Sequence, residues 1–383
     1  MPTHPPAPPV TALPRLCIDV SNTIEAASLS GVQRVTLGLG RALADQVPVE
    51  LLDGRTGKLH RATRRSRRQL HRLSRGGTNR SILTRFERRA LRSGFDPLPA
   101  FSFGADTILL DIEASWHAPQ PRAQLLPLIA SSPTVALLHD ILPITNPEWF
   151  PTASVERFEA WFHAHIAAGS TLLAVSTTTA QAVDDATSRN PAVIRMGSDD
   201  VDLPISTGEG ILMVGTIEPR KGHTLLLDAL DLLGDDAPIV DVVGRPGWEN
   251  SALFDRLDGH PSVRWHRSAS DADLDTLWNL SGLLVQPSLG EGFGLPVTEA
   301  LQRRVAVAAS DIDVMREVSR GQATLLPAKP ETWADMIRSF ADAPESWPRP
   351  ERLDWPTWRE GASDVLGALV SSGLWPDPSA ASR

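Results

Sequence analysis

Residues 287–301 read Pro-Ser-Leu-Gly-Glu-Gly-Phe-Gly-Leu-Pro-Val-Thr-Glu-Ala-Leu, and this stretch is the most informative part of the chain. The apolar run over residues 282–286 before it predicts a strand. Pro296 suits the first turn of a helix, because the N–H that proline lacks has no partner there. Amides of residues 292–294 can face a ligand, and the helix start adds a partial positive charge. The stretch therefore predicts a site for an anionic or polyhydroxylated ligand.

Composition narrows the classes of protein. A chain of 383 residues exceeds what one core usually serves, so two domains are expected. The net charge of −9 and the pI of about 5.6 disfavour a nucleic-acid partner. Cys17 is the single cysteine, which excludes an intrachain disulfide and fits a reducing cytoplasm. Tyrosine is absent, so any mechanism that needs a tyrosine acid, base or nucleophile is excluded, the tyrosine–lysine pair of short-chain dehydrogenases included.

Apolar strand-like runs alternate with helical patterns, which is typical of parallel sheets covered by helices. These runs cover residues 16–20, 107–110, 134–138, 171–175, 211–215, 238–243, 262–265, 282–286 and 305–309. Both halves begin with a strand that leads through a glycine-containing turn to a helix. We therefore predict an α/β protein of two facing Rossmann-like, doubly wound domains, with the ligand in the cleft at the carboxyl ends of their strands.

The expected organisation follows from composition changes along the chain. Residues 1–14 are proline-rich and predict a disordered N-terminus without a secretory signal, and residues 376–383 predict a tail. The first domain is expected over 15–200, a polar linker over 201–210 and the second domain over 211–352, followed by a closing helix within 353–375. No run approaches the roughly 20 apolar residues that span a bilayer. A cytoplasmic location is predicted, at most peripheral at the inner face of the plasma membrane.

Two cations follow the strand that opens the second half. Arg220 and Lys221 stand on a loop at its end, where they could stabilise a leaving diphosphate if no metal does so. An isolated Arg-Lys pair is more often a solvated surface loop. The glycine-rich acidic loop at the equivalent end of the same predicted sheet favours the site instead.

Two carboxylates flank the helix start. Glu299 alone fits an acid near a helix N-terminus, worth about 0.3–1 kcal/mol, and Glu291 alone fits a solvated loop. Eight helical residues would span about 12 Å, too far for a glycoside hydrolase pair at about 5–9.5 Å. The spacing better matches the two ends of a nucleotide-sugar. Asp-x-Asp matches at residues 200–202, 271–273 and 311–313 look like linker or helix-start acids, so neither a metal nor another cofactor is predicted.

In these motifs the C-terminal half resembles the retaining GT-B glycosyltransferases of family 4. The motifs that carry the resemblance cover residues 214–222, 243–245, 270–274, 287–301 and 309–311, with Glu317. In the first half, residues 30–35, 139–143, 146–149 and 174–176 are similar to bacterial members, mannosyl- or rhamnosyltransferase-like, that act on polysaccharide and lipopolysaccharide chains. The resemblance implies the GT-B fold.

It also implies roles. Glu299 would hold the ribose hydroxyls, while Glu291 and the amides that follow it would hold the donor sugar. Arg220 and Lys221 would bind the diphosphate, and His139 would contact a sugar hydroxyl beside the anomeric centre. The predicted catalytic set is His139, Glu291 and Lys221. The predicted donor-binding set is Gly31, Thr216, Arg220, Lys221, Arg245, Glu291, Gly292, Phe293, Gly294, Leu295 and Glu299.

Some positions depart from the family or have ordinary explanations. Many members carry an arginine where Thr216 stands, so Arg220 is expected to supply that charge from another position. A lone histidine after an apolar strand, such as His139, is often structural, and Asp140 beside it would then orient the ring. Arg245 fits a neighbour of the base or phosphate, and equally a solvated loop cation.

The segment over residues 58–92 is strongly basic. Glu87 is its only acid, and apolar residues recur between the arginines at helical spacings. A surface that contacts anionic lipid headgroups and a solvated insertion explain it equally well. Binding of nucleic acid is the third reading, weakened by the acidic remainder of the chain.

Together these observations predict a metal-independent, retaining hexosyltransferase. The first domain would bind a growing glycan or lipid-linked acceptor, and the second a nucleotide-sugar, with GDP-mannose ahead of dTDP-rhamnose. Two other classes stay open. A GT-B epimerase would release free sugar without an acceptor, and a GT-B phosphorylase would require inorganic phosphate. A non-catalytic protein would bind the donor without turnover.

Overall fold

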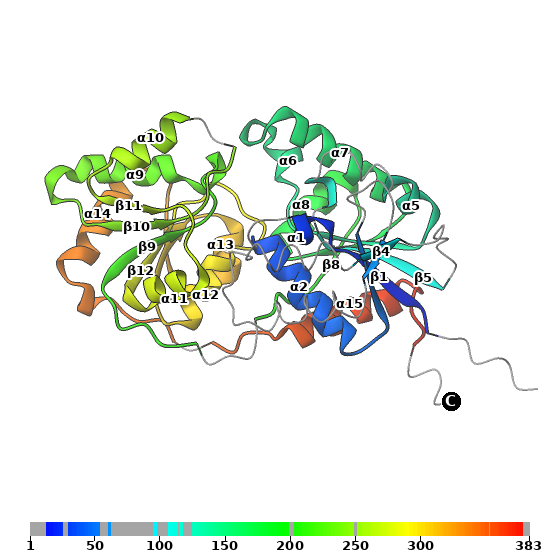
Figure 1. The fold of residues 1–383 in the computed structure, drawn as a ribbon. Helices are drawn as coiled ribbons and strands as arrows, with labels where there is room; N and C mark the ends of the chain where they lie inside the picture. The colour runs from blue at the N-terminus through cyan, green and yellow to red at the C-terminus, as the bar shows by residue number, and fades with distance from the viewer. Residues whose placement is uncertain are drawn as a thin grey trace, which may run out of the picture.

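The structure of the protein, a computed structural model, describes residues 13–25, 30–53, 60–62, 95–97, 106–113, 115–117, 125–198, 203–248, 251–351 and 353–377. Residues 1–12, most of the basic segment (63–92) and residues 378–383 of the predicted tail lie outside these ranges. The described chain forms two α/β domains that face each other (Figure 1).

The first domain is built on a sheet whose strand order, within the described residues, is β4-β3-β2-β1-β5-β6-β7-β8. Its strands are β1 Arg15–Asp19, β2 Val49–Asp53, β3 His60–Ala62, β4 Phe95–Pro97, β5 Thr107–Asp111, β6 Thr134–Leu138, β7 Thr171–Ala174 and β8 Ala192–Val193. Among the described strands, the β2–β3 and β3–β4 pairs are antiparallel and the other pairs are parallel. The order reverses between β1 and β5, which leaves a crevice at the carboxyl ends of these two strands.

The second domain has a parallel sheet in the order β11-β10-β9-β12-β13-β14. Its strands are β9 Gly210–Val214, β10 Val240–Val243, β11 Val263–His266, β12 Ser281–Gln286, β13 Ala306–Ser310 and β14 Ala323–Leu326. Here the order reverses between β9 and β12. The loops that follow these two neighbouring strands are the cationic loop and the acidic loop of the sequence, so the topology places them side by side.

Helices cover both faces of the sheets. Their bounds are α1 Ser21–Glu25, α2 Gly31–Ala44, α5 Leu125–Ser131, α6 Leu142–Thr145, α7 Thr152–Ala167, α8 Thr177–Thr187, α9 His223–Leu233, α10 Ser251–Gly259, α11 Asp271–Leu280, α12 Leu295–Gln302, α13 Asp313–Ser319, α14 Pro330–Asp342 and α15 Trp358–Ser371. Short 3-10 turns are η1 Ser115–His117, η3 Pro147–Trp149, η4 Pro219–Lys221, η5 Gly234–Asp236 and η6 Pro344–Ser346. None of these helices is long and apolar enough to cross a bilayer.

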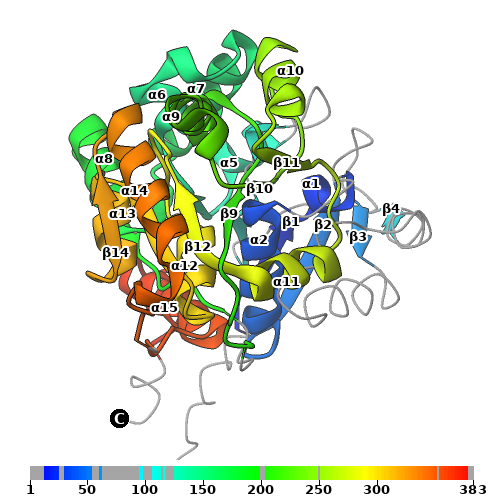
Figure 2. The same ribbon diagram turned by 90° about the vertical axis from the view of Figure 1, so that its left-hand side faces the viewer.

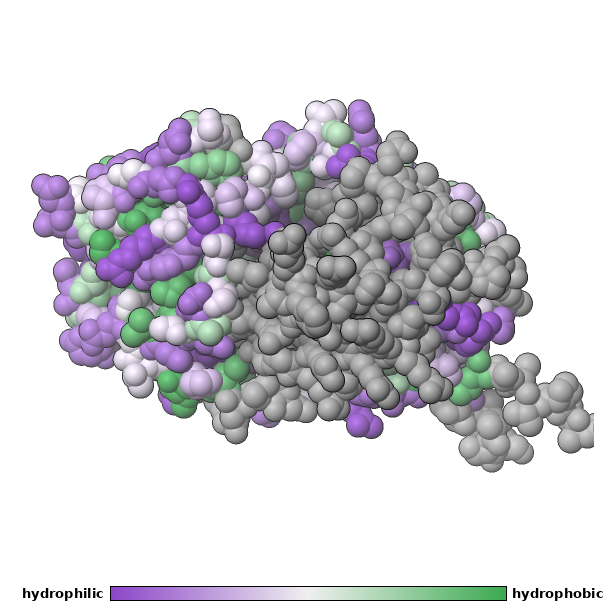
Figure 3. All heavy atoms as spheres, viewed as in Figure 1, coloured by the Kyte–Doolittle hydropathy of each residue, from purple (hydrophilic) through white to green (hydrophobic). Residues whose placement is uncertain are grey.

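Side-chain alternation along the central strands explains the layers of the second domain. Ile211 and Met213 of β9 pack in one core with α9, α10 and α14, while Leu212 packs in another with α11, α12 and α13. Because both faces are covered, the strands are apolar throughout rather than alternating. Figure 2 shows α9 and α14 on one side of β9 and β12, and α11 on the other. On the face of this domain seen in Figure 3, apolar residues are scattered among hydrophilic ones.

The last helix returns to the first domain. In α15, Trp358, Ala362 and Val365 belong to the same buried core as β1 and α2. Figure 1 shows α15 beside α2. The ring of Trp358 lies against Gly38 of α2, where a Cβ atom would come within 2.4 Å of it. The predicted closing helix is therefore part of the first domain's core, and the chain passes between the domains before β9 and again before α15.

The α/β fold of two facing domains is confirmed, and each of the nine predicted strands has its counterpart in the sheets. Five strands were not predicted: β2, β3, β4, β8 and β14. Strand β2 contains Glu50, and β8 is two residues long, so neither shows an apolar run. These strands extend the sheets at their edges or add length beyond the predicted core.

Candidate active site

A cavity of about 700 Å³ lies between the two domains, at the carboxyl ends of strands from both sheets. All residues of the predicted catalytic and donor-binding sets line it: Gly31, His139, Thr216, Arg220, Lys221, Arg245, Glu291, Gly292, Phe293, Gly294, Leu295 and Glu299. The fold thus brings together residues that are far apart in the sequence. Lining residues outside the predicted sets include Gln33, Arg34, Asp140, Trp248 and His266.

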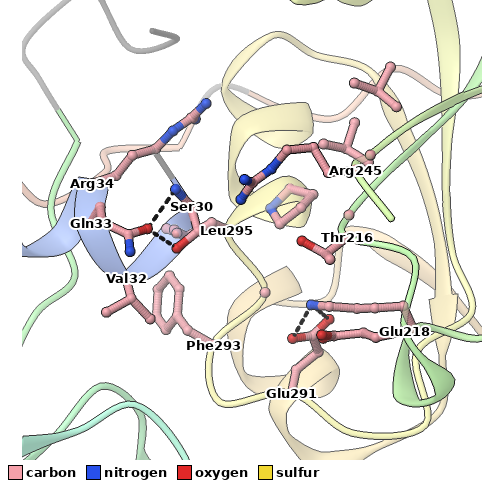
Figure 4. A pocket seen from close by; sticks show the side chains of 18 of the residues that line it. Ser30, Val32, Gln33, Arg34, Thr216, Glu218, Arg245, Glu291, Phe293 and Leu295 are labelled. Atoms are coloured by element: carbon pink, nitrogen blue, oxygen red, sulfur yellow. Dashed lines mark hydrogen bonds and ion pairs between the residues drawn. The ribbon is translucent and has the colours of Figure 1, made fainter. Parts of the chain in front are cut away.

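Glu291 is the centre of an ion-pair cluster in the wall of the cavity (Figure 4). Lys221 donates from Nζ to both of its carboxylate oxygens, at 2.6 and 2.8 Å. Arg220 donates to Oε2 at 2.9 Å, and the hydroxyl of Ser288 donates to Oε1 at 2.9 Å. Arg220 also bridges to Glu218 at 2.8 Å. Ion pairs therefore hold the loop after β12 against the turn after β9.

The backbone holds these two loops in register. The N–H of Leu289 donates to the carbonyl oxygen of Arg220 at 2.7 Å. Gly222 ends η4 with φ of +75°, and a Cβ there would lie 1.9 Å from the carbonyl oxygen of Pro287. No other residue type fits this approach, so the glycine after Arg-Lys is required by the contact itself.

The electrostatics of the cluster keep Glu291 ionised. Its burial raises the pKa, but Lys221 and Arg220 outweigh the burial and lower the pKa to about 2. For Glu218, burial prevails over the neighbouring cations and raises the pKa above the ordinary value. Two buried cations are thus balanced chiefly by one firmly charged carboxylate.

Glu299, predicted to hold ribose hydroxyls, forms an ion pair across the domain interface. Its Oε1 accepts from Arg34 of α2 at 2.9 Å, and both side chains are largely buried, at 17 % and 20 % exposure. Burial raises the pKa of Glu299 against the opposing effect of Arg34 and Arg303. Arg34 lay within the Ser30–Val35 motif of the sequence, yet its partner 265 residues away was not predicted.

His139 directly follows β6 and lines the cavity. Its Nε2 lies 2.9 Å from the carbonyl oxygen of Ile112. Since that oxygen can only accept, Nε2 carries the proton and Nδ1 of the neutral ring is an acceptor. Burial lowers the pKa of His139, which favours this neutral form. The reading in which Asp140 orients the ring is wrong, because the Ile112 carbonyl holds it and Asp140 accepts from the N–H of Leu142 at 3.1 Å.

The glycine-rich loop is in direct contact with the first domain. The carbonyl oxygen of Gly292 accepts from Ser176 at 2.6 Å and from Thr179 at 3.2 Å. A Cβ on Gly292 would lie 1.6 Å from the carbonyl oxygen of His139. Gly294, with φ of +92°, turns the chain into α12, whose first turn contains Pro296. The loop therefore fits between the domains only because it lacks side chains at these points.

Two more contacts close the interface. Glu317 of α13 accepts from the backbone N–H groups of Thr177 and Thr178, at 2.7 and 2.9 Å, at the N-terminus of α8. Trp248 donates from its indole N–H to the carbonyl oxygen of Trp149 at 2.9 Å and stacks on Phe150 with 5.6 Å between ring centroids. Both contacts join segments of the two domains that are far apart in the sequence, and neither contact was predicted.

Within the described ranges, no group of three or more His, Cys, Asp or Glu side chains is arranged to hold a metal ion. The Asp-x-Asp matches at 271–273 and 311–313 lie at or near the starts of α11 and α13. Of the match at 200–202, no residue is described.

Comparison with known proteins gives a consistent picture. Residues 200–354 match the family model described as "Glycosyl transferases group 1". The serotype-specific mannosyltransferase WbdA of Escherichia coli is 29% identical over 307 residues, which are 70% of this chain. The O-antigen chain mannosyltransferase B of Escherichia coli is 29% identical over 211 residues, 48% of this chain and 54% of that protein. This chain spans only 37% of the length of WbdA.

Solved structures also match over nearly the whole chain. HepE of Anabaena in complex with UDP-glucose has a TM-score of 0.57 and 16% identity, covering 94% of this chain and 95% of that one. Sucrose-phosphate synthase of Thermosynechococcus elongatus has a TM-score of 0.58 and 14% identity, covering 94% and 98%. These likenesses show that the two facing domains have the predicted GT-B fold.

Proposed function

We propose that the chain is a glycosyltransferase that moves a sugar from a nucleotide-sugar to a growing glycan or lipid-linked acceptor in the synthesis of cell-surface polysaccharide. The observation that carries the proposal is the cavity between the domains, with the cation–carboxylate cluster of Glu291 in its wall. The group 1 domain over residues 200–354 and the mannosyltransferase relatives support it. They favour mannose, with GDP-mannose as the first donor to test and dTDP-rhamnose as the second.

The geometry suggests how the donor would lie. The nucleoside would sit in the second domain, with its ribose hydroxyls at Glu299. The diphosphate would lie between the N-terminus of α12 and Lys221, where a helix start and a cation both favour negative charge. The sugar would then reach the loop at Glu291. His139, with Nδ1 as an acceptor, would receive a hydrogen bond from a sugar hydroxyl.

The chemistry that fits these groups is transfer with retention and without a metal. The bond from the anomeric carbon to the phosphate oxygen breaks, and a bond to the acceptor oxygen forms on the same face of the sugar. The proton of the acceptor hydroxyl passes to the departing phosphate oxygen, and the nucleoside diphosphate leaves. Lys221 would stabilise the charge that grows on this diphosphate.

The acceptor would enter from the side of the first domain. A lipid-linked acceptor would require work at the cytoplasmic face of the membrane. The basic segment, residues 58–92, is the candidate for contact with anionic lipid, and most of it lies outside the described residues. Flotation with anionic vesicles at low salt tests this contact, and loss of binding on neutral vesicles is the expected control result.

The central experiment supplies GDP-mannose, dTDP-rhamnose or UDP-glucose together with mannose-terminated oligosaccharides. Mass spectrometry detects an acceptor that has gained one hexose, and NMR of its anomeric proton reports retention or inversion. Turnover should persist in EDTA. Lys221→Ala should abolish it, whereas Lys329→Ala, which removes an exposed lysine in the same domain, should not.

The other classes of activity give different results in the same assay. Free sugar released without an acceptor would support an epimerase-type reaction, and a requirement for inorganic phosphate would support a phosphorylase. Donor binding with no turnover on any acceptor would support a binding protein. Each of these results would refute the transferase proposal.

A further inference from the structure

The cations of the cavity differ in how their charge is balanced. Arg34 pairs with Glu299, and Lys221 pairs with Glu291. Arg267 pairs with Asp258 outside the cavity and lies 4.0 Å over the ring centroid of Trp265. The remaining two cations are Arg220 and Arg245. The terminal nitrogens of Arg220 are paired with neighbouring groups, whereas the guanidinium of Arg245 is not paired with any described group.

Both terminal nitrogens of the Arg220 guanidinium are engaged by neighbouring groups, and its Nε is buried. One terminal nitrogen donates to Glu291 at 2.9 Å and to the carbonyl oxygen of Gly290 at 3.0 Å. The other bridges to Glu218 at 2.8 Å. With 15 % of the side chain exposed, little of the guanidinium is left to meet a ligand. Arg220 therefore positions the acidic loop, and the expectation that it supplies the charge missing at Thr216 is not favoured by its contacts.

Arg245 differs from the other described cations of the cavity in that its charge is not balanced by a carboxylate of the described residues. In the part of the chain that the structure describes, no hydrogen bond or ion pair engages its guanidinium, which projects into the cavity (Figure 4). Burial lowers the pKa of Arg245 below its ordinary value, because no carboxylate compensates for the lost hydration. At neutral pH it still carries its charge. A partly buried cation without a counter-charge is costly unless an anion joins it.

The backbone of Arg245 is held beside Thr216. Arg245 follows β10, and its carbonyl oxygen accepts from the N–H of Ile217 at 2.9 Å. The preceding Gly244 is so close to the chain after β9 that a Cβ would lie 1.8 Å from the carbonyl oxygen of Gly215. In Figure 4 the Arg245 side chain extends above Thr216 and its guanidinium points toward the first domain, while Arg34 enters from the opposite side. Pro296, in the first turn of α12, lines the same space.

We propose that Arg245 binds the phosphate groups of the nucleotide-sugar and of the nucleoside diphosphate that leaves, and so supplies the charge that Thr216 does not. This rests on the proposed function, since it assumes a nucleoside diphosphate in the cavity. Its chemical basis is the pairing of a guanidinium with phosphate oxygens, for which arginine is better suited than lysine. Arg245 is thereby a binding residue for the diphosphate and Arg220 a positioning residue for the loop at Glu291.

The test compares GDP, GMP and guanosine by calorimetric titration, with dTDP and UDP series run in parallel. Arg245→Met should weaken diphosphate binding roughly 10- to 100-fold, as expected for loss of a charge-assisted hydrogen bond, and leave nucleoside binding unchanged. Arg220→Met should keep the wild-type ratio of GDP to GMP affinity even where it lowers stability. A second substitution, Thr216→Arg in the Arg245→Met background, should restore most of the diphosphate affinity.

The outcomes separate this inference from the proposed function. Wild-type turnover together with an unchanged GDP to GMP ratio in Arg245→Met would overturn the inference and leave the transferase proposal standing. A lowered ratio in Arg220→Met, with Arg245→Met unaffected, would reverse the two assignments. If wild-type protein bound no nucleoside diphosphate at all, both would fail. Circular dichroism and thermal melts of each variant exclude misfolding as the cause.

Discussion

The replacement Glu291→Gln should destabilise the second domain strongly while keeping the shape of the side chain. The change removes the charge that balances Lys221 and Arg220, whose side chains are 12 % and 15 % exposed. Both cations would remain in the wall of the cavity, where Glu218 and Asp140 are the other carboxylates that act on Arg220. Because the amide can still accept hydrogen bonds, the loss measures the charge rather than the packing.

The magnitude follows from the pKa of Glu291, which falls from 4.5 to about 2. A shift of this size corresponds to roughly 3 kcal/mol between the ionised and protonated forms. Truncation of one partner in a buried ion pair typically costs about 3–5 kcal/mol, which agrees with this value. For a domain of this size, the melting temperature should fall by roughly 6–12 °C.

Urea unfolding followed by tryptophan fluorescence measures the effect, since Trp248, Trp265, Trp278 and Trp333 all lie in the second domain. The matched control is Asp335→Asn. It breaks an exposed pair with Arg338 at 3.8 Å in α14 and should cost less than about 1 kcal/mol.

The pH dependence has a definite sign. Since folding lowers the pKa of Glu291, its stabilisation is complete above the ordinary value of 4.5 and is lost as the pH falls toward about 2. The difference between wild type and Glu291→Gln should therefore stay constant from pH 7 to 5 and shrink below that. A cost under about 1 kcal/mol at pH 7, or a gap that widens on acidification, would refute the reasoning.

Three further changes probe the interface and the core. Gly292→Ala should abolish transfer, since its Cβ would meet a backbone oxygen of the first domain at 1.6 Å, whereas Gly259→Ala, with no such atom within 4 Å, should leave turnover intact. Burial and a neighbouring lysine lower the pKa of His223 from 6.5 to about 3. Wild-type stability should thus fall by about 2 kcal/mol from pH 6.5 to 5, and His223→Gln should flatten this part of the urea-derived curve. Arg34→Met should loosen the contact with Glu299 by about 1–2 kcal/mol and enlarge the radius of gyration in small-angle scattering; unchanged scattering would contradict that link.

Patterns of a few neighbouring residues predicted those strands and helix starts whose formation depends on the same few residues. The strand, glycine loop and helix start around residues 282–302 were readable because a buried parallel strand is apolar throughout and because Pro296 suits a first helical turn. The pattern gave no indication of β2, where Glu50 interrupts the apolar run, or of the two-residue β8. Pairing with the neighbouring strands, β1 and β3 for β2 and β7 for β8, makes these segments strands.

The sequence by itself determined the fold class, the doubly wound halves and the group of residues that line the cavity. Periodicity, glycine and proline carry that information within a few residues of each position. Only the tertiary structure decided which charges meet: Arg34 with Glu299, Arg220 and Lys221 with Glu291, and none of the described groups with Arg245. Pairings between distant segments depend on strand order and domain contact, since Coulomb interactions act over a few ångströms of space and are indifferent to separation along the chain.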